Sequence, residues 1–170
     1  MDKRELLQTL KALHSLSSAN KAFLQSTLSK SAPLTHYKNE IAKAVNPSVN
    51  SPIDLRRGRK AIRQFAKAAP DDLFAKVDLM VFYVEQAAAQ TLQFGTISES
   101  FYDSMHSMLN SILDLSDQLD PLQQPTIIER IRQLDDKTSG RIGWGVCDRI
   151  TEVFEELNER NHVDKHNERE

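Results

Sequence analysis

Apolar residues recur at intervals of three and four positions along almost the whole chain, and glycine, proline and serine fall between these stretches. This pattern is typical of amphipathic helices joined by short loops. No segment alternates between apolar and polar residues for long enough to form a strand. We therefore expect an all-α fold, an irregular multi-helix bundle of about eight helices, with stacked helical pairs as an alternative arrangement. The expected helices span residues 2–15, 17–28, 33–45, 54–69, 71–94, 98–119, 125–138 and 144–160.

The stretch at 71–94 is the most apolar part of the chain, and its hydrophobic residues spread around most of the helix circumference. A helix of this kind is surrounded by other helices, so we expect it at the centre of the bundle. Gly95 is expected to end it in a left-handed conformation. Residues 1–160 are expected to form a single helical domain, and residues 161–170, with one apolar member, a flexible C-terminal tail.

The amino-acid composition is that of an ordinary globular protein, with 39% hydrophobic and 27% charged residues. The single cysteine, Cys147, cannot form an intramolecular disulfide, and the N-terminus lacks the apolar run of a signal peptide. The longest apolar stretch, at 79–84, is too short to span a bilayer. We therefore expect a cytoplasmic protein that does not enter a membrane.

Charge is distributed unevenly along the chain, although the net charge is only −2. Residues 1–69 contain 13 lysines and arginines against four acidic residues, whereas residues 70–170 contain nine against 20. The densest basic group lies in the helix expected at 54–69, where spacings of three and four place several cations on one face. This candidate partner-binding face consists of Arg56, Arg59, Lys60, Arg63 and Lys67.

Three explanations of this basic face stay open. It is a solvated helix face, or it forms ion pairs with the acidic half within or between subunits, or it binds nucleic acid or another polyanion. An isoelectric point near 6.2 disfavours a dedicated nucleic-acid protein, because such domains are usually strongly basic.

Few polar residues have the spacing of a catalytic or metal site. His162 and His166 lie four apart but lack the glutamate that follows the first histidine in a zinc-hydrolase motif. His106 shares a helix face with Asp103 and Asn110, an arrangement that an ordinary polar surface explains as well as a cation site does. No glycine-rich phosphate loop, nucleophile elbow or paired CxxC motif occurs in the sequence. We therefore expect no catalytic residue, no metal and no cofactor.

A polar pocket is the remaining candidate for chemistry. Asp78 and Glu85 lie about 10 Å apart along the central helix, too far to share a proton, so each is expected to pair with a lysine or arginine of a neighbour. Glu85 and Gln86, together with Trp144, mark the expected place of a pocket. Cys147 has no histidine within four residues and is expected to be a partly buried, unreactive thiol.

Four segments occur in order along the chain: SPIDLRRGRKAIRQFAKA at 51–68, DLMVFYVEQ at 78–86, FYDSMHSML at 101–109 and GRIGWGVCD at 140–148. Together they resemble a family of uncharacterised small bacterial all-helical proteins, a domain of unknown function. The resemblance implies a bacterial cytoplasmic protein without an assigned activity, and it supplies no catalytic residues. The family pattern has a histidine before the last aspartate, where this chain has Cys147.

The turn Gly143–Trp144–Gly145 also fits the family pattern. Two glycines allow the backbone to turn tightly, and the indole is expected to insert into the core as a structural plug.

These observations favour a non-enzymatic protein-interaction module that binds another protein or a second copy of itself. One alternative is binding of nucleic acid or another polyanion through the basic helix at 54–69. A second alternative is a small-ligand or enzyme pocket near Glu85 and Trp144.

Overall fold

The computed structural model describes residues 2–17, 20 and 34–167. These residues form seven α-helices and no strand, which confirms the expected all-α fold. The helix expected at 17–28 lies almost entirely outside the described residues. The helices are α1 (Lys3–Leu16), α3 (Leu34–Val45), α4 (Leu55–Ala68), α5 (Leu73–Phe94), α6 (Glu99–Ser116), α7 (Gln124–Thr138) and α8 (Val146–Asn167).

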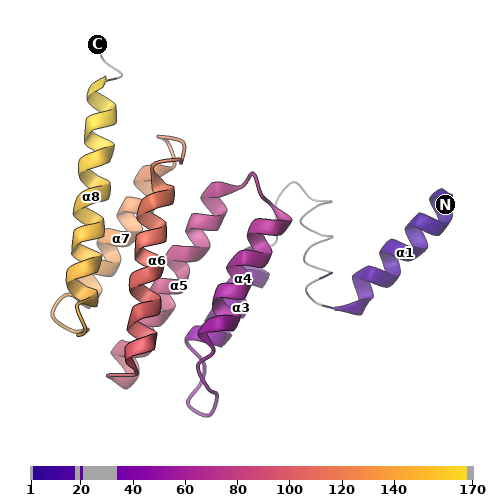
Figure 1. Ribbon diagram of the computed structural model, residues 1–170, viewed down its shortest axis with the longest axis horizontal. Helices are drawn as coiled ribbons and strands as arrows, with labels where there is room; N and C mark the ends of the chain where they lie inside the picture. Colours follow the sequence, from indigo (N-terminus) through magenta and orange to yellow (C-terminus); the bar gives the residue numbers. More distant parts are fainter. Residues whose placement is uncertain (1, 18–19, 21–33, 168–170) are drawn as a thin grey trace.

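Consecutive helices pair, and the pairs α3–α4, α5–α6 and α7–α8 stand side by side in a row (Figure 1). The stack is held together mainly through α5, which packs against α3, α4, α6 and α7, and through α8, which also packs against α6. The alternative arrangement of stacked helical pairs is therefore the one adopted. The pair α3–α4 forms one end of this stack and the pair α7–α8 the other.

Helix α5 is central because it is apolar nearly all round, as its sequence indicated. Val77, Leu79 and Val84 are completely buried within it. The Asp72 side chain accepts a hydrogen bond from the Ala75 amide at the start of the helix. Gly95 ends it at φ +80°, the positive φ that was expected of glycine there, although its ψ of −154° lies outside the left-handed helical region.

Helices α3, α4 and α5 pack closely together at Gly58. A Cβ atom at this position would lie 2.7 Å from Val45 Cγ2 and 2.9 Å from Tyr83 Cε2. Both distances are below van der Waals contact, so only glycine allows α4 to pack this tightly against its neighbours.

Helix α8 continues to Asn167, beyond the end expected near residue 160. Residues 161–167 are therefore helical, where a flexible tail at 161–170 was expected. Asn161 is only 8% exposed, so α8 still packs against the rest of the protein where this extension begins. No described helix is both long and apolar enough to span a lipid bilayer.

Candidate functional site

Four cations of α4 point away from the core on the side of the helix opposite Ile62 and Phe65. All four are exposed, and none makes a hydrogen bond or ion pair with another residue that the structure describes. Their spacing of four, three and four residues keeps them on one line along the helix. We call this line the basic stripe; it consists of Arg56, Lys60, Arg63 and Lys67.

A groove of about 510 Å³ lies beside the basic stripe, between α4 and α3. Three cations of the stripe line it, together with His36 and Glu40 of α3. The one carboxylate on the α3 side is already engaged, because Arg57 donates a hydrogen bond of 2.7 Å to Glu40. That hydrogen bond holds the pKa of Glu40 below its usual value, even though partial burial raises it. The groove therefore presents a net positive surface.

Arg59 was expected on the same face, but the structure turns it towards α6. Its guanidinium donates to the Ser104 hydroxyl at 3.1 Å and to the Ser104 carbonyl at 2.9 Å. The Tyr83 hydroxyl completes the cluster at 2.7 Å from the Ser104 hydroxyl. Arg59 thus ties α4 to α6 and α5, and it lies apart from the basic stripe.

The same cluster predicts a pH dependence of stability. Burial raises the pKa of Tyr83 above 10.0, although the hydrogen bond with Ser104 and the charge of Arg59 oppose this shift. A raised pKa in the folded state stabilises the protein below the pKa of the unfolded chain, and the contribution is lost as pH rises through the folded pKa. We expect the melting temperature to fall above about pH 10, and less steeply for Tyr83→Phe. Calorimetry across this range measures both slopes; equal slopes would contradict the assignment.

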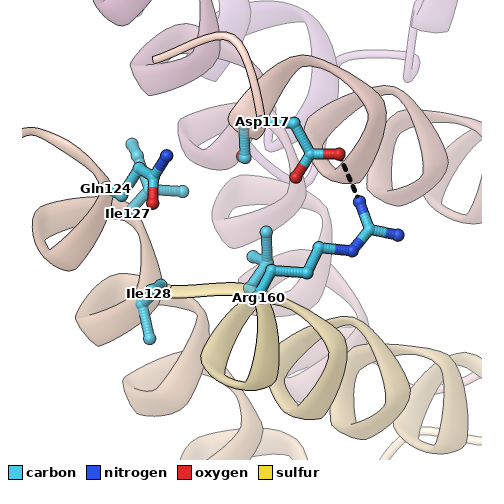
Figure 2. A pocket seen from close by; sticks show the side chains of 7 residues that line it. Asp117, Gln124, Ile127, Ile128 and Arg160 are labelled. Carbon is cyan, nitrogen blue, oxygen red and sulfur yellow. Dashed lines mark hydrogen bonds and ion pairs between the residues drawn. The ribbon is translucent and has the colours of Figure 1, made fainter. Parts of the chain in front are cut away.

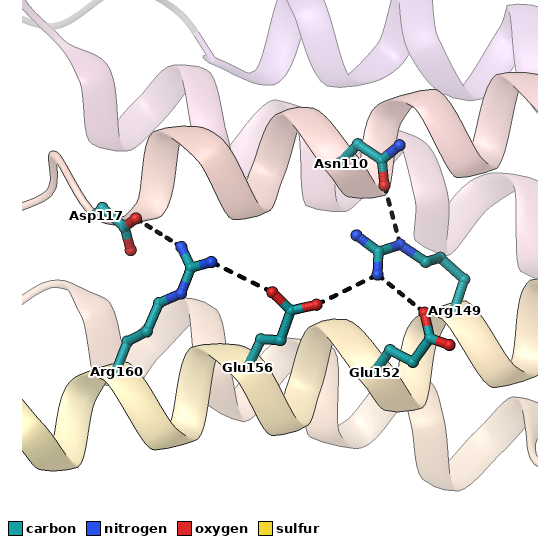
Figure 3. Close-up of polar contacts among 6 residues, drawn as sticks. All are labelled: Asn110, Asp117, Arg149, Glu152, Glu156 and Arg160. Atoms are coloured by element: carbon teal, nitrogen blue, oxygen red, sulfur yellow. Dashed lines mark hydrogen bonds and ion pairs between the residues drawn. The ribbon is translucent and has the colours of Figure 1, made fainter.

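Among the side chains that the structure describes, none of the acidic half covers the basic stripe. Several of its carboxylates pair instead with arginines of the same half, as Figure 3 shows between α6 and α8. Glu156 lies between Arg149 and Arg160, at 3.4 and 3.2 Å, and Arg160 also lies 2.6 Å from Asp117, the residue after α6. Residues 17–33, which are mostly undescribed, contain no aspartate or glutamate that could pair with the stripe.

Asp78 and Glu85 are both held by Arg130 of α7. Arg130 donates to the two Glu85 oxygens at 2.9 and 2.7 Å and also to the Asp78 carboxylate, and Lys38 of α3 lies 2.8 Å from Asp78. This confirms the expectation that each carboxylate pairs with a cation from a neighbour. Burial lowers the pKa of Arg130, but its hydrogen bonds and the charges of Glu85 and Asp78 outweigh burial and raise it. The two cations balance the charge of the two carboxylates, and the network joins α3, α5 and α7.

A groove of about 310 Å³ does lie beside Glu85 and Gln86, and Arg130 and Lys137 of α7 line its other side. Gln86 accepts a hydrogen bond from Asn46 at 3.1 Å. The guanidinium of Arg130 is already bonded to two carboxylates, so Lys137 is the cation of this lining that has no ion pair among the described residues. The small-ligand hypothesis stays a prediction for Glu85 and Gln86, but Trp144 does not line this groove.

Trp144 does not insert into the core, which corrects the expected structural plug. It is 56% exposed, and its indole stacks on the Tyr102 ring with centroids 5.8 Å apart. Its backbone lies at φ +60°, a region that non-glycine residues rarely occupy, and His106 Nε2 lies 3.1 Å from its carbonyl oxygen. The tight turn therefore forms as expected, but it directs the indole over α6 rather than inward.

Cys147 is half-buried, as expected, and its sulfur lies 2.8 Å from the carbonyl oxygens of Thr138 and Ile142. These contacts bind the thiol to the end of α7. In the part of the chain that is described, no three His, Cys, Asp or Glu side chains come together as a metal site.

A small hollow between the ends of α6, α7 and α8 measures only about 10 Å³ (Figure 2). Ile127 and Ile128 of α7 line it, and the ion pair of Arg160 with Asp117 crosses it. This volume accommodates one water molecule at most, so the hollow is a packing feature and not a ligand site.

Sequence reasoning missed three residues that organise this molecule: Lys38, Arg130 and Ser104. Lys38 lies 40 positions before Asp78, with which it pairs, and Arg130 lies 45 positions after Glu85. Only the fold brings them together, although the position of Arg130 between Ile128 and Ile131 was a local signal of a partly buried cation.

The fold and these contacts define a class of protein, a short stack of three helical pairs with a basic surface at one end. No protein-family model, no characterised protein and no solved structure matches the chain. The resemblance to a family of small bacterial helical proteins therefore stays a prediction.

Proposed function

We propose that this protein is a non-enzymatic interaction module whose basic stripe binds an acidic surface of a partner protein. The observation that carries the proposal is the set of four exposed cations of α4, which have no partner among the described residues. Unpaired charges of one sign on a rigid helix attract and orient a surface of the opposite sign. We propose the cytoplasm as the place of this binding, because the single cysteine cannot form the intramolecular disulfides that are typical of oxidising compartments.

An acidic protein surface suits the site better than nucleic acid does. The stripe lies on one helix of 14 residues, about 21 Å long, which spans few phosphates. Glu40 lies in the adjoining groove, and the chain as a whole carries a net charge of −2. A polyanion longer than the helix would be repelled by the acidic half of the protein.

Fluorescence anisotropy at low salt tests the proposal with two labelled probes of equal net charge, a glutamate-rich peptide and a single-stranded oligonucleotide. We expect the peptide to bind, and Lys60→Glu with Arg63→Glu to weaken binding roughly tenfold, since two exposed ion pairs are each worth up to about 1 kcal/mol. A matched control reverses two exposed cations at the other end of the stack, Lys137→Glu and Arg141→Glu, and should leave the affinity nearly unchanged.

Equal losses of peptide affinity in the two double variants would show that binding depends on net charge alone, and would contradict the basic stripe as the binding site. Tight binding of the oligonucleotide without binding of the peptide would instead favour the nucleic-acid alternative.

A further inference from the structure

Helix α8 carries a line of acidic residues that mirrors the basic stripe. All four are exposed, on the side of α8 opposite the buried Ile150 and Val153. Glu152 pairs with Arg149 at 2.9 Å, but the other three make no hydrogen bond or ion pair with any residue that the structure covers. We call this line the acidic stripe; it consists of Asp148, Glu152, Glu155 and Glu159.

The two stripes have the same spacing. Steps of four, three and four residues separate the cations of α4, and the same steps separate the carboxylates of α8. Each stripe therefore spans about 16 Å along its helix. Because the spacing of four, three and four residues is symmetric, every cation can face a carboxylate whether the two helices run parallel or antiparallel.

The two stripes cannot meet within one molecule. Helix α4 belongs to the pair at one end of the stack and packs on α3 and α5. Helix α8 belongs to the pair at the other end and packs on α7 and α6 (Figure 1). A contact between the stripes therefore requires two copies of the chain.

We infer that the partner of the basic stripe is a second copy of this chain, whose acidic stripe docks on it head to tail. The inference rests on the proposed function and names the acidic surface that the stripe takes. It follows from opposite charge, equal spacing and placement at opposite ends of the stack. Such a contact is heterologous: every added copy leaves one basic and one acidic end free, so the chain of copies grows or closes into a ring.

Several of the other charged groups beside the stripes are already paired or engaged. On the α4 side, Glu40 is held by Arg57, and Asp54 accepts a hydrogen bond from the Arg57 amide at the helix start. On the α8 side, Arg149 and Arg160 turn towards α6, where Asn110 and Asp117 accept their hydrogen bonds. Arg149 also pairs with Glu152, so Asp148, Glu155 and Glu159 are the carboxylates of the acidic stripe that have no partner among the described residues.

Sedimentation velocity of the full chain under reducing conditions tests the inference, at about 20 mM and about 500 mM salt, where exposed charges are weakly and strongly screened. We expect association that grows with protein concentration at low salt and disappears at high salt. One variant replaces all four cations of the basic stripe with glutamate, and another replaces all four carboxylates of the acidic stripe with lysine. Each should be monomeric alone, and their equimolar mixture should associate again.

A cross-link shows that restored association uses the stripes and not net attraction between oppositely charged variants. In a Cys147→Ser background, Lys60→Cys should form a mixed disulfide with Glu152→Cys if the helices are parallel, or with Glu155→Cys if they are antiparallel. As a control, Lys137→Cys, at an exposed position of α7, should form a mixed disulfide with neither Glu152→Cys nor Glu155→Cys. These single substitutions also serve where a fourfold variant fails to fold.

Three results would overturn the inference: a wild-type protein that stays monomeric at low salt, a mixture of the two variants that stays monomeric, or cross-links that form equally well through residue 137. The experiments distinguish failure of this inference from failure of the proposed function. A monomeric protein that still binds the glutamate-rich peptide retains the interaction site and loses only the second copy as partner.

Discussion

Arg130→Ala is expected to lower the free energy of unfolding by about 3 kcal/mol, because it leaves Glu85 without a cation and removes one of the two cations of Asp78. The side chains of Arg130, Asp78 and Glu85 are only 20%, 15% and 30% exposed, so water replaces the lost hydrogen bonds poorly. Lys38 still neutralises Asp78, which keeps the loss near the lower end for a buried pair. Thermal melting should show a decrease in Tm of about 6–12 °C for a domain of this size.

Arg132→Ala is the matched control. Arg132 lies on the same helix and also pairs with two carboxylates, Glu129 and Asp136, but its side chain is 46% exposed. Exposed pairs of this kind contribute about 0–1 kcal/mol, so its Tm should hardly change. Similar losses in the two variants would mean that burial of the Arg130 network has no energetic role.

Gly58→Ala is expected to destabilise the protein by about 1–3 kcal/mol, as overpacking of a close-packed core does. This change in stability is opposite to the one that helix propensity predicts, since alanine is favoured over glycine inside a helix by about 1 kcal/mol. It is reversed because the added methyl group would meet Val45 and Tyr83 at less than 3 Å. Chemical denaturation of the variant measures the loss.

A second substitution identifies the cause. Val45→Ala removes the methyl group nearest to position 58, so it should cost less in the Gly58→Ala background than in the wild type. At the exposed position 60 of the same helix, glycine should be the less stable residue, about 1 kcal/mol below alanine. Additive effects of the two core substitutions would show that no clash occurs.

Local chemistry was enough to predict most helix boundaries. Helix α4 begins where Asp54 can accept from the Arg57 amide, and α5 ends where Gly95 can adopt a positive φ. The central position of α5 followed from its apolar circumference, and the pairing of Asp78 and Glu85 followed from the cost of burying a bare charge.

The direction of individual side chains was beyond local chemistry. Arg59 and Lys60 are adjacent in sequence, yet Arg59 bonds to Ser104 while Lys60 stays in solvent, because α6 lies on only one side of α4. Trp144 was expected inside on hydrophobicity alone. Its position depends instead on a turn that aims the ring at Tyr102, and nothing in the turn's own sequence specifies that direction.

The stacking of Trp144 on Tyr102 also gives the protein an intrinsic fluorescent probe of unfolding. Trp144 is the only tryptophan of the chain, and it joins the turn before α8 to the first turns of α6. Its intrinsic fluorescence therefore follows separation of the last helical pair from the middle one, whereas circular dichroism follows loss of all helices together. If the two signals change at different denaturant concentrations, the terminal pair opens before the rest of the stack unfolds.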